Sequence, residues 1–416
     1  MRIRIVTLGC KLNFAESSAL MRSLEAAGHV RAKAGEEADV VIVNTCTVTD
    51  TADHKDRQAI HRLRRENPKA KLIVTGCYAA LMKQRSEVGI QKSEIRQKDA
   101  EILKEIDRLV VKDLTKFQPA WSRDDRTRCF LKVQDGCNYF CTYCTIPYAR
   151  GRSRNMPIAD VVAQAKQALA EGAKEIVLTG VNIGDFGRST GETFIELLRA
   201  IDAIETASLS EHSTQNTDFR VRISSCEPNL LTDEIIEFVA HSKHFAPHFH
   251  IPLQSGSNEV LKIMHRRYTR ELFAERVTHI KSVMSNAFIG VDCMVGVRGE
   301  TEECFNDYVA FVQSLPVSQL HVFTYSERAN TKMLEMDLCV VPKAERDRRS
   351  KVLHRISEEK LAAFYAAHKG EEATVLWEGK RFEGGQMSGF TENYIKVFAP
   401  FDKAKVNTFE RIVISH

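Results

Sequence analysis

The chain has 416 residues, of which 43% are hydrophobic and 27% are charged, and its formal net charge is +4. That length permits two to four domains with hydrophobic cores, and the composition is that of an ordinary soluble protein. The mild positive charge permits a nucleic-acid partner without requiring one, and no stretch has the apolar length that crosses a bilayer.

The cysteine content and the first residues bear on the cellular compartment. The apolar run in MRIRIVTLGC is too short for a signal peptide. Eleven cysteines in such a chain indicate metal ligands and buried thiols rather than a disulfide framework. We therefore expect a cytoplasmic protein with no membrane partner.

The N-terminal third alternates short β-rich runs with helical patterns. Strands are expected at 2–8, 39–44 and 71–75, and helices at 16–27 and 51–66. This alternation predicts a parallel α/β sheet. The charged stretch 83–113 shows no clear final strand, and 99–111 is predicted to be helical.

A cysteine follows each of these three strands: Cys10 in LGC, Cys46 in NTC and Cys77 in TGC. The carboxyl ends of parallel strands share one edge of the sheet, where open α/β sheets bind ligands. One such cysteine alone is more often a buried structural thiol. Three at equivalent positions predict a metal centre that they share.

The stretch 131–154, LKVQDGCNYFCTYCTIPYARGRSR, holds Cys137, Cys141 and Cys144 at the spacing C-x3-C-x2-C. Three thiolates this close can converge on one centre, and thiolates select iron–sulfur clusters, zinc or copper(I). A closed zinc site needs four ligands, and this run offers no nearby fourth Cys or His. The spacing therefore favours a four-iron cluster with one iron left open, and three structural cysteines are the alternative.

From residue 130 onward, strands and helices alternate again. Strands are expected at 130–134, 175–179, 219–224, 248–253, 287–297 and 318–325, with amphipathic helices at 158–171, 193–205 and 301–315. Six βα units predict a partial version of the eightfold barrel, with its chemistry at the C-terminal ends of the strands. The loop with three cysteines follows the first of these strands.

Polar residues follow the next three strands and are candidate ligand contacts: Gly180, Asn182, Ser225, Glu227 and Gln254. Turn glycines and ordinary Asn or Ser caps explain each of them equally well. Arg150, Arg152 and Arg154 follow the cysteine loop, and arginine suits bidentate contacts to a carboxylate or a phosphate. A solvated basic edge is the alternative for these arginines.

Four histidines resemble a metal-binding tract: His241, His244, His248 and His250. Only His248 and His250 share a strand face, so we expect no metal site there.

The tail changes character after a charged amphipathic helix at 342–368. Short strands with glycine turns are expected at 374–377, 394–398 and 411–414, and they predict a small β-barrel of a kind that binds nucleic acid. Phe390, Tyr394 and Lys396 are candidate RNA contacts, although a core position for the aromatics is the simpler interpretation. The expected domains are 1–115, 116–369 and 370–416.

Several motifs, in order along the chain, resemble those of the radical-SAM methylthiotransferases, enzymes that use S-adenosylmethionine (SAM). They are TLGCKLN, NTCTVTDTAD, VTGCYAA and the cysteine loop with Tyr143 before its third cysteine. LGCKLN, with Lys11 and Asn13, is most similar to the branch that acts on N6-threonylcarbamoyladenosine in tRNA. GFTENYIKV resembles the TRAM domain that ends this family and contacts tRNA.

The resemblance implies two 4Fe–4S clusters. Cys10, Cys46 and Cys77 would hold an auxiliary cluster. Cys137, Cys141 and Cys144 would hold the cluster that binds and cleaves SAM. The side chains expected to bind SAM are Gly180, Asn182, Ser225, Glu227, Gln254 and Arg150.

The implied function is methylthiolation of N6-threonylcarbamoyladenosine beside the anticodon of tRNA. One SAM would donate a methyl group to sulfur, and another would yield the radical that abstracts a ring hydrogen. The expected partners are tRNA and a flavodoxin- or ferredoxin-like electron donor, with the chain as a monomer. Two alternatives remain: the same chemistry on a ribosomal-protein aspartate, and a zinc-stabilised RNA-binding protein without catalysis.

Overall fold

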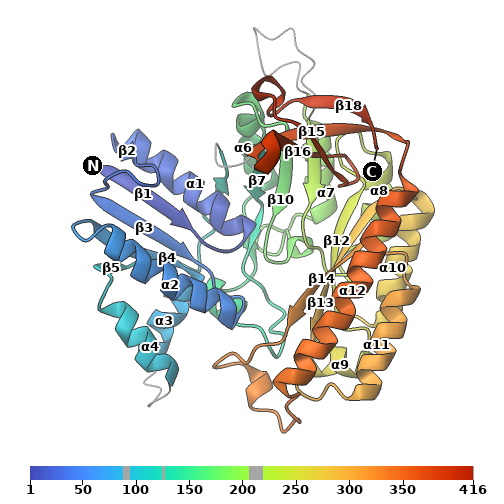
Figure 1. Cartoon of the computed structure of the whole chain (residues 1–416), viewed down its shortest axis with the longest axis horizontal. Helices are drawn as coiled ribbons and strands as arrows, with labels where there is room; N and C mark the ends of the chain where they lie inside the picture. Colours follow the sequence, from blue (N-terminus) through green and yellow to red (C-terminus); the bar gives the residue numbers. More distant parts are fainter. Residues whose placement is uncertain (88–93, 124–126, 206–218, 416) are drawn as a thin grey trace.

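A computed structural model describes residues 1–87, 94–123, 127–205 and 219–415 (Figure 1). The chain folds into an N-terminal sheet with helices, a central set of strands with an outer layer of helices, and a C-terminal sheet that lies against the centre. Within those described ranges, no helix combines the length and the apolar character needed to cross a membrane.

The N-terminal sheet is parallel throughout, as the alternation of strands and helices predicts. Its strands lie in the order β2-β1-β3-β4-β5. The strands are β1 (Arg2–Thr7), β2 (Val30–Arg31), β3 (Val40–Thr45), β4 (Lys71–Gly76) and β5 (Arg108–Leu109), and the helices are α1 (Lys11–Ala26), α2 (Asp50–Glu66), α3 (Cys77–Glu87) and α4 (Glu94–Leu103). β3 is buried along its whole length because helices cover both sides of the sheet.

The predicted helix at 99–111 is wrong, because α4 ends at Leu103 and β5 follows as a parallel neighbour of β4. Asp107 fixes this turn, since its carboxylate accepts hydrogen bonds from the Leu72 amide at 2.6 Å and from Arg64 Nη2 at 2.5 Å. These partners lie 35 and 43 residues away, so helical propensity in the charged stretch gives no sign of them.

In the central part, six parallel strands follow one another in chain order. β7, β10 and β11 form one run and β12, β13 and β14 another, and bridges from Val221 to Phe245 and from Ser225 to His250 join the two. The strands are β7 (Arg128–Lys132), β10 (Glu175–Thr179), β11 (Arg220–Ile223), β12 (His248–Gln254), β13 (Phe288–Val295) and β14 (Gln319–Thr324). The C-terminal ends of these strands therefore share one edge.

An outer layer of helices covers these strands (Figure 1). The helices of the central part are α5 (Ile146–Arg150), α6 (Ile158–Ala170), α7 (Phe194–Asp202), α8 (Asp233–His241), α9 (Asn258–Ile263), α10 (Arg270–Val283), α11 (Glu302–Ser314) and α12 (Lys343–Ala367). Of these, α5 is not in the outer layer but packs against α3 of the N-terminal part. Three short strands complete the part: β6 (Ala120–Trp121) pairs antiparallel with β7, and β8 (Gln134–Asp135) pairs with β9 (Arg154–Asn155). Apolar side chains of the strands and helices form one large buried core between the layers.

The C-terminal part is an antiparallel four-stranded sheet in the order β17-β16-β15-β18. Its strands are β15 (Glu372–Arg381), β16 (Gln386–Phe390), β17 (Lys396–Pro400) and β18 (Phe409–Val413), of which β16 was not predicted. Val375 and Trp377 share a core with Phe288 of β13 and Phe364 of α12, so this sheet is packed on the central part.

Buried ion pairs also join the parts. Glu175 accepts from Arg220 Nε at 2.6 Å and Arg222 Nε at 2.9 Å, and both arginines donate onward to carbonyl oxygens of the C-terminal sheet. Arg328, just after β14, contacts Asp53 at 2.9 Å and the Thr47 carbonyl at 2.9 Å in the N-terminal part. The three parts are thus held in one arrangement by contacts with little exposure to water.

Candidate functional site

Three thiols, here called the N-terminal thiols, lie at the C-terminal ends of β1, β3 and β4: Cys10, Cys46 and Cys77. Each is within electrostatic range of another of the three. Gly9 makes this approach possible, because it has a φ of 100° and a Cβ there would lie 2.4 Å from the Cβ of Cys46. Burial raises the pKa of Cys46 to about 12 and that of Cys77 to about 11. Both thiols therefore stay protonated at neutral pH unless a bound metal displaces their protons.

Asn13 and Arg150 frame the N-terminal thiols. Asn13 Nδ2 donates to the carbonyl oxygens of Leu8 and Thr45, each at 2.8 Å, and so ties together the ends of β1 and β3. Arg150 Nε lies 3.2 Å from Cys77 Sγ, and its Nη2 donates to Asn13 Oδ1 at 2.6 Å. The guanidinium thus places a fixed positive charge beside the thiols.

Arg150 has a different set of partners from the SAM carboxylate or phosphate expected from the sequence. Its remaining nitrogen, Nη1, contacts Asp135 Oδ1 at 3.0 Å and Glu16 Oε1 at 3.3 Å. All of its nitrogens are therefore bound by the protein itself, and the residue links the N-terminal part to the loop after β8.

The second group, here called the loop thiols, is Cys137, Cys141 and Cys144, and it lies between β8 and α5. Gly136 has a φ of 71°, and a Cβ there would lie 2.1 Å from the carbonyl oxygen of Arg152, so only glycine allows the loop to close. Burial raises the pKa of Cys137 and of Cys144 to about 12.

Arg266 and Glu227 support the loop thiols. Arg266 Nη1 lies 3.2 Å from Cys141 Sγ, while its Nη2 forms a short ion pair with Glu227. Burial raises the pKa of Glu227, and Arg266 opposes that rise. Arg266 could not be singled out from the sequence, because it lies 125 residues from Cys141 and no motif spacing marks it.

The donor sets fit iron–sulfur clusters better than single zinc ions. In neither group do the three sulfurs all lie within 4.8 Å of one another, although every one of these cysteines is described. Ligands of one tetrahedral zinc crowd around a single ion, whereas thiolates on separate irons of a cluster stand further apart. Each group also has an arginine beside a sulfur, which complements the negative charge of a cluster.

Contacts of neighbouring residues bring the two groups close together. Thr145, which follows Cys144, donates from Oγ1 to the carbonyl oxygen of Thr47, which follows Cys46, at 3.4 Å. Arg150, at the end of α5, reaches Cys77 directly. The loop thiols and the N-terminal thiols therefore border one region, although more than 100 residues separate Cys10 from Cys137.

The candidate SAM contacts lie at the strand ends beside the loop thiols. Asn182 is buried next to the Tyr139 hydroxyl, and neither polar atom of its amide forms a hydrogen bond of normal geometry in the described part of the chain. A buried amide in that state is costly unless a ligand satisfies it. Gly180 lies against Gln134, and a Cβ there would lie 2.8 Å from Gln134 Oε1.

Gln254 and Ser225 lie further along the same edge. Gln254 has a φ of 63° at an irregularity in the β12–β13 pairing, which turns the chain out of the strand. Ser225 Oγ lies 3.2 Å from His250 Nδ1, so it is engaged with a neighbouring strand.

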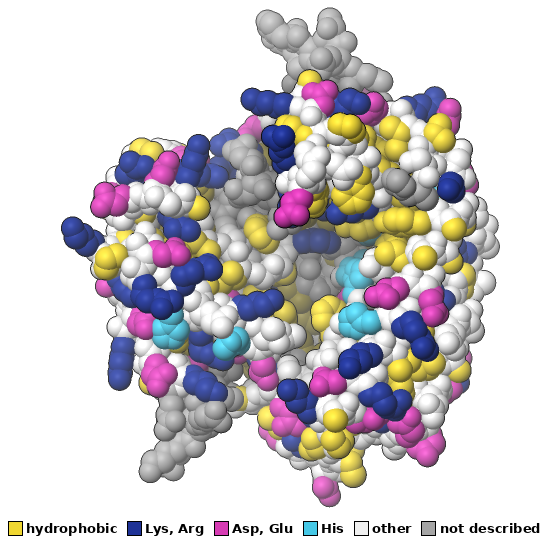
Figure 2. Space-filling view, in the orientation of Figure 1, with side chains coloured by type: hydrophobic (Ala, Val, Ile, Leu, Met, Phe, Trp, Pro, Cys, Tyr) yellow, Lys and Arg dark blue, Asp and Glu magenta, His cyan; other side chains and the backbone are white. Residues whose placement is uncertain are grey.

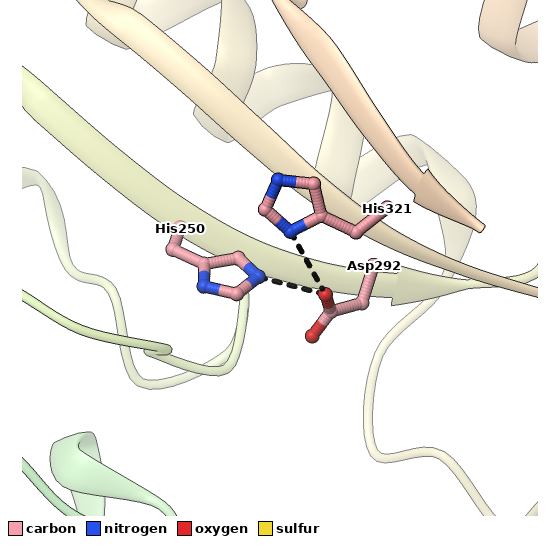
Figure 3. A group of neighbouring side chains, drawn as sticks. All are labelled: His250, Asp292 and His321. Atoms are coloured by element: carbon pink, nitrogen blue, oxygen red, sulfur yellow. Dashed lines mark hydrogen bonds and ion pairs between the residues drawn. The ribbon is translucent and has the colours of Figure 1, made fainter. Parts of the chain in front are cut away.

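A group of polar side chains that the sequence did not reveal lies on β12, β13 and β14: His250, Asp292 and His321 (Figure 3). Burial would raise the pKa of Asp292, but the two imidazoles outweigh that effect and hold it below its usual range. The other histidines of the sequence tract do not join this group, since His248 packs against Phe288 and Tyr394.

The molecular surface is hollowed between the N-terminal part and the central strands, and histidine side chains line one wall of the hollow (Figure 2). Lysine and arginine side chains lie at its back and around its rim. The hollow is thus a polar, mostly basic space.

The sequence matches two family models. The Radical SAM superfamily model covers residues 131–312, and a model described as uncharacterized protein family UPF0004 covers residues 2–95. The first match includes the loop thiols, and the second includes all three N-terminal thiols.

Curated relatives match over nearly the whole length. The threonylcarbamoyladenosine tRNA methylthiotransferase MtaB of Bacillus subtilis is 37% identical, over 94% of this chain and 88% of its own. The protein of the same name from Aquifex aeolicus is 34% identical, over 95% and 96%. A tRNA-2-methylthio-N(6)-dimethylallyladenosine synthase of Desulfitobacterium hafniense is 28% identical, over 99% and 94%.

Among solved structures, the radical S-adenosylmethionine methyltransferase TsrM from Kitasatospora setae matches with a TM-score of 0.53 at 16% sequence identity. The match covers 80% of this chain and 76% of that one. At this identity the likeness concerns the fold alone.

Proposed function

This chain belongs to the radical-SAM tRNA methylthiotransferases, and from that membership we propose that it methylthiolates N6-threonylcarbamoyladenosine next to the anticodon of tRNA. The observation that carries the proposal is the meeting of the two thiol groups through Thr145 and Thr47 and through Arg150 and Cys77. Two sulfur-bound centres must face one substrate for this reaction, and these contacts support that arrangement. The relatives of highest identity above bear the name of this substrate.

We assign one 4Fe–4S cluster to the N-terminal thiols and one to the loop thiols, with SAM at the second. When bound, these groups supply a SAM-derived radical and a methylthio group, which acid–base chemistry cannot provide at a ring C–H of adenine. Arg150 and Arg266 each lie beside a sulfur and stabilise the negative charge that a cluster brings.

The residues that orient SAM in this proposal lie around the loop thiols. The amide of Asn182 binds a polar group of SAM, and Gly180 beside it allows Gln134 to pack closely against the chain at this strand end. Glu227, held by Arg266, accepts from an ammonium or hydroxyl group of SAM. Gln254 and Ser225 border the same space, whereas Arg150 is assigned to the auxiliary cluster and not to the SAM carboxylate.

The central strands act in this proposal as a partial (β/α)6 barrel, and the C-terminal sheet acts as a TRAM domain that binds tRNA. The rings of Phe390 and Tyr394 stack with their centroids 4.7 Å apart, and the guanidinium of Arg128 lies over both rings. They thus help to join the C-terminal sheet to the central part. Lys396 Nζ lies 4.9 Å from the ring of Phe398, which is exposed. This cation with its exposed ring is the better candidate for stacking on RNA.

The test is nucleoside analysis of tRNA from a strain that lacks this protein and is complemented with variants. Wild type restores the 2-methylthio derivative of N6-threonylcarbamoyladenosine, while Cys141→Ala and Cys46→Ala do not. Anaerobically purified wild type contains about eight irons per chain and each variant about four. Stoichiometric zinc without iron, or methylthiolation that survives either substitution, contradicts the proposal.

A further inference from the structure

His250, Asp292 and His321, here called the His–Asp–His group, are not used by the reaction described above. His250 Nε2 lies 2.8 Å from Asp292 Oδ1, and His321 Nδ1 lies 3.6 Å from the same oxygen (Figure 3). Ser225 Oγ is the partner of the other ring nitrogen of His250, at 3.2 Å. His321 Nε2 has no partner among the described residues, and its side chain is 38% exposed.

Of the two contacts to Asp292, the one from His250 is a hydrogen bond, and the one from His321 is an ion-pair contact longer than a hydrogen bond. In Figure 3 both imidazoles point at one carboxylate oxygen, so this oxygen occupies the position that a shared cation would take. The ligand atoms do lie within 4.8 Å of one another, and a bound divalent cation is therefore one outcome that the experiment must detect.

The group lies within electrostatic range of a residue next to each set of thiols. Asp292 is within electrostatic range of Glu227, whose partner Arg266 contacts Cys141. It is also within electrostatic range of Lys11, the residue after Cys10. A base that both clusters must reach has to lie next to this group.

Lys11 has one carboxylate within electrostatic range among its described neighbours, Asp292, which His250 and His321 already engage. Lys11 is half-buried, and its ammonium has no hydrogen-bond or ion-pair partner within the described chain. Two cations in its range already have acidic partners, since Arg128 pairs with Glu378 and Arg222 with Glu175. A half-buried ammonium is stabilised when a ligand supplies the missing negative charge.

We propose that Lys11 and His321 hold the carboxylate of the substituent on N6 of the substrate adenosine, with Asp292 orienting the His321 ring. This inference rests on the proposed function, because a threonylcarbamoyl group carries a carboxylate that a dimethylallyl group lacks. A charged ammonium and an imidazole N–H are suitable donors for the two oxygens of a carboxylate. The pair thus determines which modified adenosine the enzyme accepts.

The experiment compares two anticodon stem-loop RNAs bound to the anaerobically reconstituted holoenzyme. One bears N6-threonylcarbamoyladenosine, and the other bears its methyl ester, which lacks the negative charge. Lys11→Met and His321→Ala each raise the dissociation constant of the RNA with the free acid about 10- to 100-fold. They leave the dissociation constant of the RNA with the methyl ester within about twofold of the wild-type value. Lys11→Arg keeps the positive charge and largely restores binding of the acid.

Gly290→Ala is a gentler variant that leaves both donors in place. The added Cβ would lie 3.7 Å from His321 Nε2, an ordinary contact distance, so the strand is retained while access to that nitrogen narrows. It weakens binding of the acid less than His321→Ala does. The matched controls are Lys33→Met, at an exposed lysine after β2, and His279→Ala, at a histidine that pairs with Glu237 between α10 and α8; both are expected to bind the two RNAs like wild type.

Each result supports or overturns the inference. The inference is overturned if the variants weaken binding of the acid RNA and the ester RNA equally, or if Lys11→Met does not weaken binding of the acid RNA. In either case, methylthiolation of the acid RNA by the wild type leaves the proposed function standing. A Co²⁺ spectrum of bound metal that disappears in Asp292→Asn overturns it in favour of a metal site. A wild-type enzyme that does not modify the acid RNA overturns the proposed function and this inference together.

Discussion

At the scale of single residues, Gly9 decides whether the N-terminal thiols can meet. Its φ of 100° and the 2.4 Å that a Cβ would leave to Cys46 exclude every other residue. Spacing and strand ends single out the six cysteines in the sequence, and their role as cluster ligands stays a prediction. Their neighbour Arg266 could not be predicted, because it reaches Cys141 through a contact between distant parts of the chain that no local pattern records.

Gly9→Ala is expected to remove the auxiliary cluster and spare the other one. The iron content after anaerobic reconstitution falls from about eight to about four per chain, because Cys46 is pushed away from Cys10. Gly28→Ala is the matched control, since it has a φ of 85° with no neighbour within 4 Å. Gly28→Ala is expected to lower the free energy of unfolding by only about 1–2 kcal/mol, the cost of a left-handed backbone at alanine. It is expected to keep the full iron content. Full iron in Gly9→Ala contradicts the expected geometry.

At the scale of elements, strand pairing explains what the sequence could not show. β16 reads QMSGF, which is too short and too polar to predict as a strand, yet β15 and β17 pair with it on both sides. Gly389 allows this, since a Cβ there would lie 2.4 Å from Val375. The long periodic segments, such as α6 and α11, were predicted to within a few residues because they carry their pattern locally.

The buried Glu175 joins β10 and β11 to the C-terminal sheet and gives a pH dependence. Burial alone would raise its pKa, but Arg222 and Arg220 lower it to about 2. Because the folded pKa lies below the unfolded value of about 4.3, the stabilisation is complete above pH 4.3 and is lost as the pH falls toward 2.

We therefore expect acid to destabilise the wild type more steeply than Glu175→Gln between pH 4.3 and 2. The difference in unfolding free energy between the two proteins shrinks by about 3 kcal/mol over this range. Urea unfolding of the cluster-free proteins at several pH values measures it. Parallel pH profiles for the two proteins would show that Glu175 is not ionised in the fold.

At the scale of the whole molecule, buried charges join the parts in addition to the apolar core that the C-terminal sheet shares with the centre. Arg328 joins the end of β14 to Thr47, Asp50 and Asp53, next to Cys46. Sequence analysis predicted the parallel α/β character of the sheets correctly, and the division at residues 115 and 369 stays a prediction. It could not give their mutual placement, since ion pairs such as Arg328–Asp53 span 275 residues and leave no periodic trace.

Arg328→Met is expected to uncouple SAM cleavage from methylthiolation of the RNA. Both clusters and SAM cleavage are retained, but the methylthiolated nucleoside falls up to about 100-fold relative to 5′-deoxyadenosine, because a small displacement misplaces the reacting groups. The ratio of the two products in a single-turnover assay measures this. Arg348→Met, whose partners Glu302 and Glu345 are on the outer helices, is the control and keeps the wild-type ratio.

Arg150 has a consequence for exchanging parts between related enzymes. It belongs to the segment after Cys144, yet its guanidinium rests on Cys77 and is shared with Asn13 and Glu16. A chimaera that takes its first 115 residues from another family member must therefore carry matching residues at 13, 16 and 150. The N-terminal part and the central part are therefore not interchangeable modules. Exchanging one of them alone would leave mismatched contacts at the interface next to both clusters.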